Sequence, residues 1–231
     1  MDLPRPMEVA PGTIAVWSDP GCPWSHAVVW RLWDARRRLG LEERVRLDHH
    51  AFPLELFNDE PTPRRHIDVE APVAATIAPR AGWQPWAGLD SAWPVTLLPA
   101  MEAVQAAKAQ SLTASEALDR GLRRALYAES RCISLRHVIL EVAGETDGID
   151  VAALAAALDD GRARRAVIDD WHTAQGDEVR GSAHLFLADG TNAQNPGIDI
   201  GWEDDGSRHG RYWIAGDDPG AVDDLVRAAA G

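Results

Sequence analysis

Apolar and polar positions near the start of the chain form a strand pattern, a helix pattern and a second strand pattern. Residues 13–19 are a β-branched apolar run that ends in the turn residues Asp19, Pro20 and Gly21. A helical face follows, made of Val28, Leu32, Ala35 and Leu39. Gly40 is placed to end this helix, and the alternation in residues 44–52 predicts the second strand.

The middle of the chain contains a Pro-, Trp- and Gly-rich stretch followed by a series of helix patterns. Residues 61–93 are rich in Pro, Trp and Gly and predict an irregular lid with at most a short helix. Helical spacing then predicts one helix through Leu97, Met101, Val104 and Lys108. Further helices are expected to begin at a capping box of Thr113 and Glu116, at Ser134 and at Asp150, with Gly161 ending the third and a last one over 163–175.

The C-terminal part returns to strand patterns. Residues 182–190 read as an apolar strand that runs into an Asp-Gly turn, and residues 201–216 as a short hairpin. Asp218 and Pro219 are start signals for a closing helix. The order predicts an α/β domain made of residues 13–60 and 178–231, with a helical insertion or lid over 61–177.

Charge and composition narrow the classes of partner. The 231-residue chain carries 36 acidic and 23 basic residues, a formal net charge of −13. Such a surface repels phosphate backbones and anionic lipid, so we expect neither nucleic acid nor membrane as a partner. The first residues show no secretory leader, no run is long enough to span a bilayer, and the two cysteines do not make a disulfide framework. These features favour a cytoplasmic protein.

Cys22 is the residue that calls for a chemical explanation. With Pro23 at the first helical position, Cys22 lies at or beside the N-cap, where free N–H groups and the helix dipole favour a thiolate. We therefore expect a lowered pKa, with the hydroxyl of Ser25 donating a hydrogen bond to the sulfur. The alternative is a small apolar residue packed in a turn.

A serine cannot release a mixed disulfide as a second cysteine would, so another group must complete any thiol exchange. A small cellular thiol is the simplest candidate. Cys132 is a second, if its Cα comes within about 7 Å of that of Cys22. A third possibility is that no disulfide forms and that the thiolate attacks another electrophile or orients a bound thiol.

Several stretches together resemble the DsbA-like thioredoxin-fold family, in particular its cytoplasmic FrnE-type members. These stretches are DPGCPWSH, the helix after it, ALYAESRCIS and GSAHLFLADG, and the resemblance runs from about Thr13 to Ala230. It implies a thioredoxin-like fold with an inserted helical domain and thiol-disulfide oxidoreductase activity. The family nucleophile maps onto Cys22, and its resolving cysteine onto Ser25.

The resemblance also assigns the surroundings of the nucleophile. Pro23 and Trp24 match the dipeptide of the family motif. Ser182 and Ala183 match the loop where the family carries a cis-proline, and both are expected to line the site. A non-proline cis bond costs about 2.5–4 kcal/mol, so a trans peptide or a shifted loop is expected at Ala183. Substrate- or thiol-binding residues are therefore expected at Pro23, Trp24, His26, Ser182 and Ala183.

Other side chains are weighed by their positions. His26 either raises the local positive potential or faces solvent, and Asp19 caps the turn. His49 and His50 are adjacent on a strand and point to opposite faces, so no metal site is expected. Arg64 and Arg65 are exposed residues of the lid with a possible carboxylate-binding role. Trp24 is expected to form an aromatic wall beside Cys22. This role is expected less of Trp83, Trp86 and Trp93.

The function expected from the sequence is thiol-dependent oxidoreduction through Cys22 and Ser25, with a disulfide or small molecule as substrate. No tightly bound cofactor is expected, and a low-molecular-weight thiol is the co-substrate. The alternatives are a transferase or isomerase of the kappa glutathione transferase kind, and a non-catalytic binding protein of the same fold. The sequence leaves the substrate, the thiol and the oligomeric state open, with a homodimer as one option.

Overall fold

A four-stranded sheet forms the centre of the first and last parts of the chain. The computed structural model describes residues 7–176, 178–204, 206 and 210–231. The strand order is β2-β1-β3-β4, with β1 (Thr13–Ser18) parallel to β2 (Arg46–Ala51) and antiparallel to β3 (His184–Leu187). β4 (Asn192–Gln194) pairs antiparallel with β3 at the edge of the sheet.

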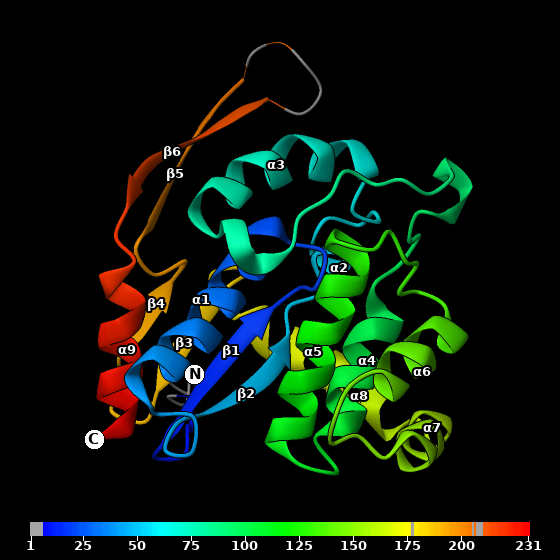
Figure 1. The fold of residues 1–231 in the computed structure, drawn as a ribbon, viewed down its shortest axis with the longest axis horizontal. Coiled ribbons are helices and arrows are strands. Elements are labelled where there is room, and N and C mark those ends of the chain that lie inside the picture. Colours follow the sequence, from blue (N-terminus) through cyan, green and yellow to red (C-terminus); the bar gives the residue numbers. More distant parts are fainter. Residues whose placement is uncertain (1–6, 177, 205, 207–209) are drawn as a thin grey trace.

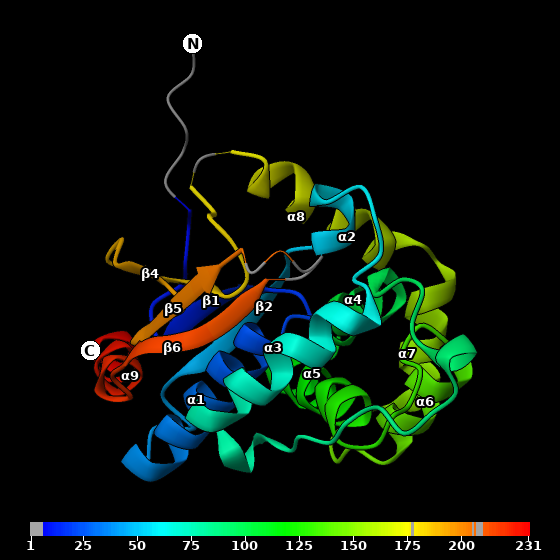
Figure 2. The ribbon, with the colours of Figure 1, turned by 90° about the horizontal axis from the view of Figure 1, so that it is seen from above.

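Helices cover both faces of the sheet. Side chains of β1 alternate between the faces, since Ile14 and Val16 pack against α1 (Pro23–Leu39) and α9 (Gly220–Ala230). The other face carries Ala15 and Trp17, which pack near the end of α8 (Arg162–Ala174). Figure 2 shows α1 and α8 on opposite sides of the two parallel strands.

The segment between β2 and β3 is helical. It contains the following elements: α2 (Leu54–Phe57), α3 (Arg64–Ile77), η1 (Pro79–Ala81), η2 (Asp90–Ala92), α4 (Leu98–Ala107), α5 (Leu112–Tyr127), α6 (Arg136–Gly144), α7 (Val151–Asp159) and α8. Helices α4 to α8 share an apolar core that includes Leu118, Leu122 and Ile139. They lie to one side of the sheet, whereas α3 crosses above its end (Figure 1). The division into two domains stays a prediction.

A buried ion pair joins the first helix to the helical segment. Arg36 on α1 bonds Glu116 on α5 and also donates to the carbonyl oxygen of Val45 at 2.8 Å. Glu116 was expected to cap α5 together with Thr113, and this is wrong. The N-cap is Ser111, whose side chain accepts from the N–H of Ala114.

The hairpin expected over 201–216 is present as a separate two-stranded sheet. β5 (Ile198–Glu203) pairs antiparallel with β6 (Arg211–Asp217), while residues 205 and 207–209 of the expected hairpin lie outside the described residues. The hairpin stands beside α3 (Figure 1). Tyr212 and Ile214 of β6 pack in the same cluster as Ala74 of α3.

Most of the predicted helix starts and ends are present in the structure, and two predicted helix starts are wrong. The structure confirms Cys22 as the N-cap of α1, Gly40 as its left-handed end and Asp150 as the cap of α7. Ser134 is not a cap, because α6 begins after Leu135. The largest error is the lid: residues 64–77 form a 14-residue helix, α3, which accommodates Pro72 within it.

No helix in the described part of the chain is both long enough and apolar enough to cross a bilayer.

Candidate functional site

The turn before α1 positions Cys22 through hydrogen bonds to Asp19. The N–H of Cys22 donates to the carbonyl oxygen of Asp19 at 3.1 Å, and the N–H of Gly21 donates to Asp19 Oδ1 at 2.7 Å. Asp19 Oδ2 accepts from the N–H of Leu54 at 2.9 Å. Asp19 therefore caps the turn, as expected, and burial raises its pKa to about 6.

Cys22 itself is almost completely buried. Its side chain is 6% exposed and clusters with Trp24 and Ala74, and Sγ donates to the carbonyl oxygen of Ser182 at 3.4 Å. Burial, followed by the negative charge of Glu70, raises the pKa of the thiol to about 11. The expectation of a lowered pKa is therefore wrong: the helix N-terminus is present, but desolvation outweighs it.

Ser25 serves the backbone and not the sulfur. Its hydroxyl is fully buried and lies 2.7 Å from the carbonyl oxygen of Asp19 and 3.0 Å from that of Cys22, its two possible acceptors. It accepts from Arg123 Nη1 at 2.9 Å. The predicted hydrogen bond from the hydroxyl to the sulfur is wrong, because the hydroxyl is committed to these partners. The backbone N–H of Ser25 favours the thiolate instead.

The side chain of Arg123 on α5 forms hydrogen bonds to the turn that carries Cys22. The side chain is 1% exposed and donates to the carbonyl oxygen of Asp19 at 3.1 Å and to Ser18 Oγ at 2.8 Å. Its Nε donates to Asp119 Oδ2 at 2.8 Å. Burial opposes ionisation of Asp119, but Arg123 outweighs it and keeps the pKa of that carboxyl below its usual range. The sequence analysis missed both residues, although an Asp and an Arg four apart on the same helix were a usable signal.

The peptide bond between Ser182 and Ala183 is cis. The expectation of a trans peptide is wrong, since hydrogen bonds hold both residues against their neighbours. Ser182 Oγ accepts from the N–H of Asp19 at 2.9 Å. The N–H of Ala183 donates to Asn195 Oδ1 at 3.1 Å, and its carbonyl oxygen accepts from the N–H of Asn195 at 2.9 Å. The loop lies against Cys22 as expected.

His26 differs from both roles considered for it. The ring is 4% exposed, so it does not face solvent. It stacks on Tyr127 with centroids 4.5 Å apart and meets Trp83 edge-on at the same distance. Burial, followed by the charge of Arg123, lowers the pKa of His26 to about 3. At neutral pH the ring is uncharged and adds no positive potential to the site.

The sequence analysis also missed a carboxyl group on α3, that of Glu70, whose negative charge acts on Cys22. Glu70 is 6% exposed, and its Oε1 lies 2.5 Å from His66 Nε2. Tyr212 of β6 lies beside this pair, and burial together with Glu70 raises the pKa of its hydroxyl to about 12. The sequence analysis took residues 64–77 as part of an irregular lid, and for this reason it did not include Glu70 in the predicted site.

The remaining candidates separate into near and distant groups. Trp24 and Trp83 pack in the Cys22 cluster, and Trp24 also contacts Tyr212, whereas Trp86 and Trp93 pack edge-on against each other. Pro23 occupies the first turn of α1, buried beside Cys22.

The other charged candidates lie outside this cluster. Arg64 pairs with Asp68 and Asp90, while Arg65 forms no hydrogen bond or ion pair with the residues described. His49 is buried toward Asp119 and His50 stacks on Trp17, which confirms their opposite directions. Over the described ranges, no three His, Cys, Asp or Glu side chains gather as metal ligands.

Comparison with known proteins gives one family match. Residues 13–197 match the DsbA-like thioredoxin domain. No curated protein sequence matches the chain.

Solved structures share the fold at low sequence identity. The cytosolic disulfide reductase DsbM from Pseudomonas aeruginosa, solved with GSH, is 20% identical, with a TM-score of 0.63 over 94% of this chain and 96% of that one. A probable DsbA oxidoreductase from Streptomyces coelicolor is 16% identical, with a TM-score of 0.62 over 94% and 89%. A 2-hydroxychromene-2-carboxylate isomerase is also 16% identical, with a TM-score of 0.52 over 78% and 87%. The expected α/β, thioredoxin-like fold with inserted helices is thereby confirmed.

Arg123→Met should destabilise the protein strongly, because it leaves Asp119 buried without its cation and removes the donor to Ser25. We expect a loss of about 3–5 kcal/mol in the free energy of unfolding, measured by denaturant titration. Arg124→Met is the matched control, since that side chain is 74% exposed, and it should cost less than about 1 kcal/mol. Equal losses in the two variants would contradict the role given to Arg123.

The thiol of Cys22 should react slowly at neutral pH. In a Cys132→Ser background, the alkylation rate is expected to keep rising with pH, toward a midpoint near 11 set by burial. Mass spectrometry identifies the modified residue. A midpoint below the free-cysteine value of about 8.5 would show that the helix N-terminus prevails over desolvation.

Proposed function

The chain belongs to the DsbA-like thioredoxin domain family, and from this premise we propose that it is a thiol-disulfide oxidoreductase with a single nucleophilic cysteine, Cys22. One observation carries the proposal: Cys22 lies at the N-cap beside the Ser182–Ala183 loop, while Ser25 is held by Arg123. The position that would resolve a disulfide is thus filled by a side chain with a structural role.

The first chemical step is attack by Cys22 on a disulfide. The Sγ thiolate forms a bond to one substrate sulfur, the substrate S–S bond breaks, and the departing thiolate takes up a proton. The N–H of Ser25 stabilises the thiolate before attack. The product is a mixed disulfide between Cys22 and half of the substrate.

A small thiol completes the cycle. Its thiolate attacks the mixed disulfide, forms a new disulfide with the bound half and releases Cys22 as a thiol after protonation. A second small thiol then attacks this new disulfide and releases the bound half as a thiol. The two electrons that reduce the substrate therefore come from two small thiols, which end joined as a disulfide. The DsbM structure solved with GSH supports a partner of this chemical class.

The raised pKa of Cys22 means that a proton must leave the sulfur when substrate arrives. Glu70 is the carboxyl group whose charge acts most strongly on this thiol, and it lies on α3 one helical turn before Ala74, which packs against Cys22. We assign Glu70 as the proton acceptor. His66, bonded to Glu70, and Tyr212, whose raised pKa keeps its hydroxyl protonated, are positioning residues for that carboxyl.

Further parts of the proposal concern the setting of the reaction. The protein acts in the cytoplasm, in line with the description of DsbM as cytosolic, and it needs no tightly bound cofactor. Pro23, Trp24 and the Ser182–Ala183 loop line the path of the substrate to Sγ. The substrate is a disulfide or another small oxidised molecule.

A second candidate is an isomerase or transferase in which a bound thiol performs the chemistry. Two observations favour it: the raised pKa of Cys22 and the likeness to the 2-hydroxychromene-2-carboxylate isomerase. This reading predicts tight binding of a small thiol and no mixed disulfide. It also predicts no Cys22-dependent turnover of a disulfide, which the kinetic test below measures.

Turnover of bis(2-hydroxyethyl) disulfide by glutathione, followed through a coupled reductase, tests the role of the two cysteines. Cys22→Ser should reduce the rate to that of the uncatalysed reaction, because no other thiol lies at the N-cap. Cys132→Ser should retain the wild-type rate. Loss of activity in Cys132→Ser with full activity in Cys22→Ser would overturn the assignment.

Glu70→Gln should raise the rate of Cys22 alkylation and lower the rate of disulfide turnover. Removing the charge lowers the pKa of Cys22, so alkylation at neutral pH becomes faster. Disulfide turnover at the same pH should fall about a hundredfold, because the proton acceptor is gone.

Glu8→Gln is the control for Glu70→Gln. It makes the same change at an exposed position ahead of β1, and it should change neither measurement. If Glu70→Gln increases both the alkylation rate and the turnover, Glu70 only opposes the thiolate and is no acceptor.

A further inference from the structure

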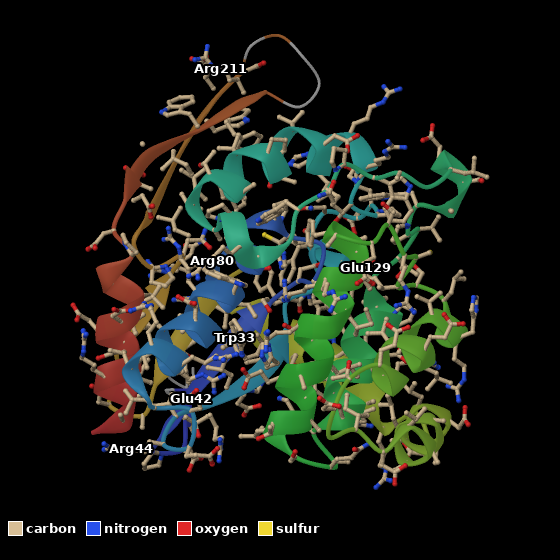
Figure 3. The ribbon with its side chains drawn as sticks, viewed as in Figure 1. Trp33, Glu42, Arg44, Arg80, Glu129 and Arg211 are labelled. Carbon is tan, nitrogen blue, oxygen red and sulfur yellow. The ribbon has the colours of Figure 1, made fainter. Side chains whose placement is uncertain are left out.

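A cavity of about 530 Å³ lies between α1 and α5, and its volume is in the range of small-molecule sites. One face of α1, with Trp30 and Trp33, lies opposite one face of α5, with Ala117 and Arg120. Trp33 lies between the two helices (Figure 3). None of the described residues that line this cavity packs in the cluster around Cys22, so it is separate from the proposed path of the disulfide.

The ring of Trp33 carries two arginine side chains. The guanidinium carbon of Arg120 lies 3.7 Å from the centroid of the ring, and that of Arg37, one helical turn after Trp33, lies 4.7 Å from it. Stacking uses the flat face of a guanidinium and leaves the N–H groups at its edge free to donate. Neither guanidinium forms a hydrogen bond or an ion pair within the described part of the chain. Two cations are thus held in place without an anion.

The carboxylates nearest to Arg120 are bonded to other arginines. Glu116 bonds Arg36, and Asp119 accepts from Arg123 at 2.8 Å. Burial lowers the pKa of Arg120, so its guanidinium is partly withdrawn from water, although it stays charged at neutral pH. Its side-chain nitrogens are nevertheless open to solvent, which lets a ligand reach them. Water screens a partly buried charge less than an exposed one, and this strengthens its attraction for an anion.

Arg80 of η1 adds a third guanidinium where the cavity opens to solvent. Its side chain is 72% exposed, and the guanidinium carbon lies 5.1 Å from the centroid of the Trp30 ring. Its carboxylate partner is Asp34 at 3.2 Å, which is also bonded to Arg38 at 3.0 Å. One carboxylate therefore serves two arginines, and the opening of the cavity keeps a positive charge.

Two carboxylates line the cavity from the segment after α6. Glu145 is bonded to Arg131 at 2.6 Å. Asp147 is exposed, so water screens its charge. The charge that remains is positive, in a chain whose formal net charge is −13. The complementary ligand is therefore an anion.

Two unpaired guanidinium groups on one ring match a dianion better than a single carboxylate. A phosphate monoester carries a charge of about −1.5 to −2 at neutral pH and has three acceptor oxygens. A guanidinium can donate two parallel N–H groups to such oxygens. Trp30 and Ala117 offer apolar surface to the rest of the molecule. We infer that this cavity binds a small organic phosphate, with the phosphate group on Arg120, the charge of Arg37 nearby and the carbon skeleton along Trp30.

Isothermal titration calorimetry with phenyl phosphate, in a low-salt buffer free of phosphate, tests the site. We expect saturable binding about tenfold tighter than that of benzoate, which has the same ring but one charge, and about tenfold tighter than that of inorganic phosphate, which lacks the ring. Absence of saturable binding would overturn the inference. Benzoate that binds as tightly would refute the phosphate group, and inorganic phosphate that binds as tightly would refute the organic part.

Variants locate the probe. Arg120→Gln removes the charge without breaking a hydrogen bond or an ion pair of the described residues, so it should fold and bind phenyl phosphate about tenfold more weakly. Arg37→Gln, at an exposed position that leaves the interior unchanged, should weaken binding about threefold. Ala117→Phe places a ring in the cavity and should abolish binding. Unchanged affinity in Arg120→Gln or in Arg37→Gln would overturn the inference.

Arg65→Gln is the matched control. It removes the same charge from another arginine without an ion pair, on α3 and outside this cavity, so it should bind phenyl phosphate as the wild type does. An equal loss in Arg65→Gln and Arg120→Gln would show a response to net charge alone and overturn the inference. Cys22→Ser should also bind as the wild type does. Loss of binding in Cys22→Ser would place the probe at the thiol and refute a separate site.

Discussion

The buried guanidinium of Arg123 is the interaction on which the arrangement of the site depends. It connects α5 of the helical segment to the carbonyl oxygen of Asp19 and to the hydroxyls of Ser18 and Ser25. Asp119 balances its charge within the same helix. The turn that presents Cys22 is therefore set by a residue about a hundred positions away in the sequence. The hydroxyl oxygen of Ser25 accepts a hydrogen bond from the guanidinium of Arg123, and this explains a serine at that position.

Burial then determines the chemistry of the thiol. The sheet and α1 alone would leave Cys22 at an open helix N-terminus, where a thiolate is favoured. Helix α3 and strand β6 close over it, and desolvation raises the pKa of the sulfur and lowers that of His26. The negative charge of Glu70, on the same helix, raises the pKa of the sulfur further. With Glu70 as the proposed proton acceptor, the buried thiol is expected to react only with molecules that reach Sγ.

The sequence predicted what local rules control and missed what distant contacts control. The N-cap at Cys22, Pro23 in the first turn, and Gly40 at the helix end follow from short-range preferences, and all are present. Residues 64–77 were taken as irregular because Pro and Trp dominate the region, yet tertiary packing makes them a helix. Asn195 bonds the residue of the cis bond, Ala183, and Arg123 bonds Ser25. The pKa of Cys22 is raised first by burial and then by Glu70. No local pattern around the cysteine contains Asn195, Arg123 or Glu70.

The central claim is that Cys22 alone carries the exchange, and intact-mass analysis after incubation with excess glutathione disulfide tests it most directly. The account predicts one glutathione per chain, attached at Cys22 and released when reduced glutathione is added. The wild type and Cys132→Ser should give the same adduct. An internal disulfide between Cys22 and Cys132, or a Cys22 that remains unmodified while the protein turns over substrate, would contradict it.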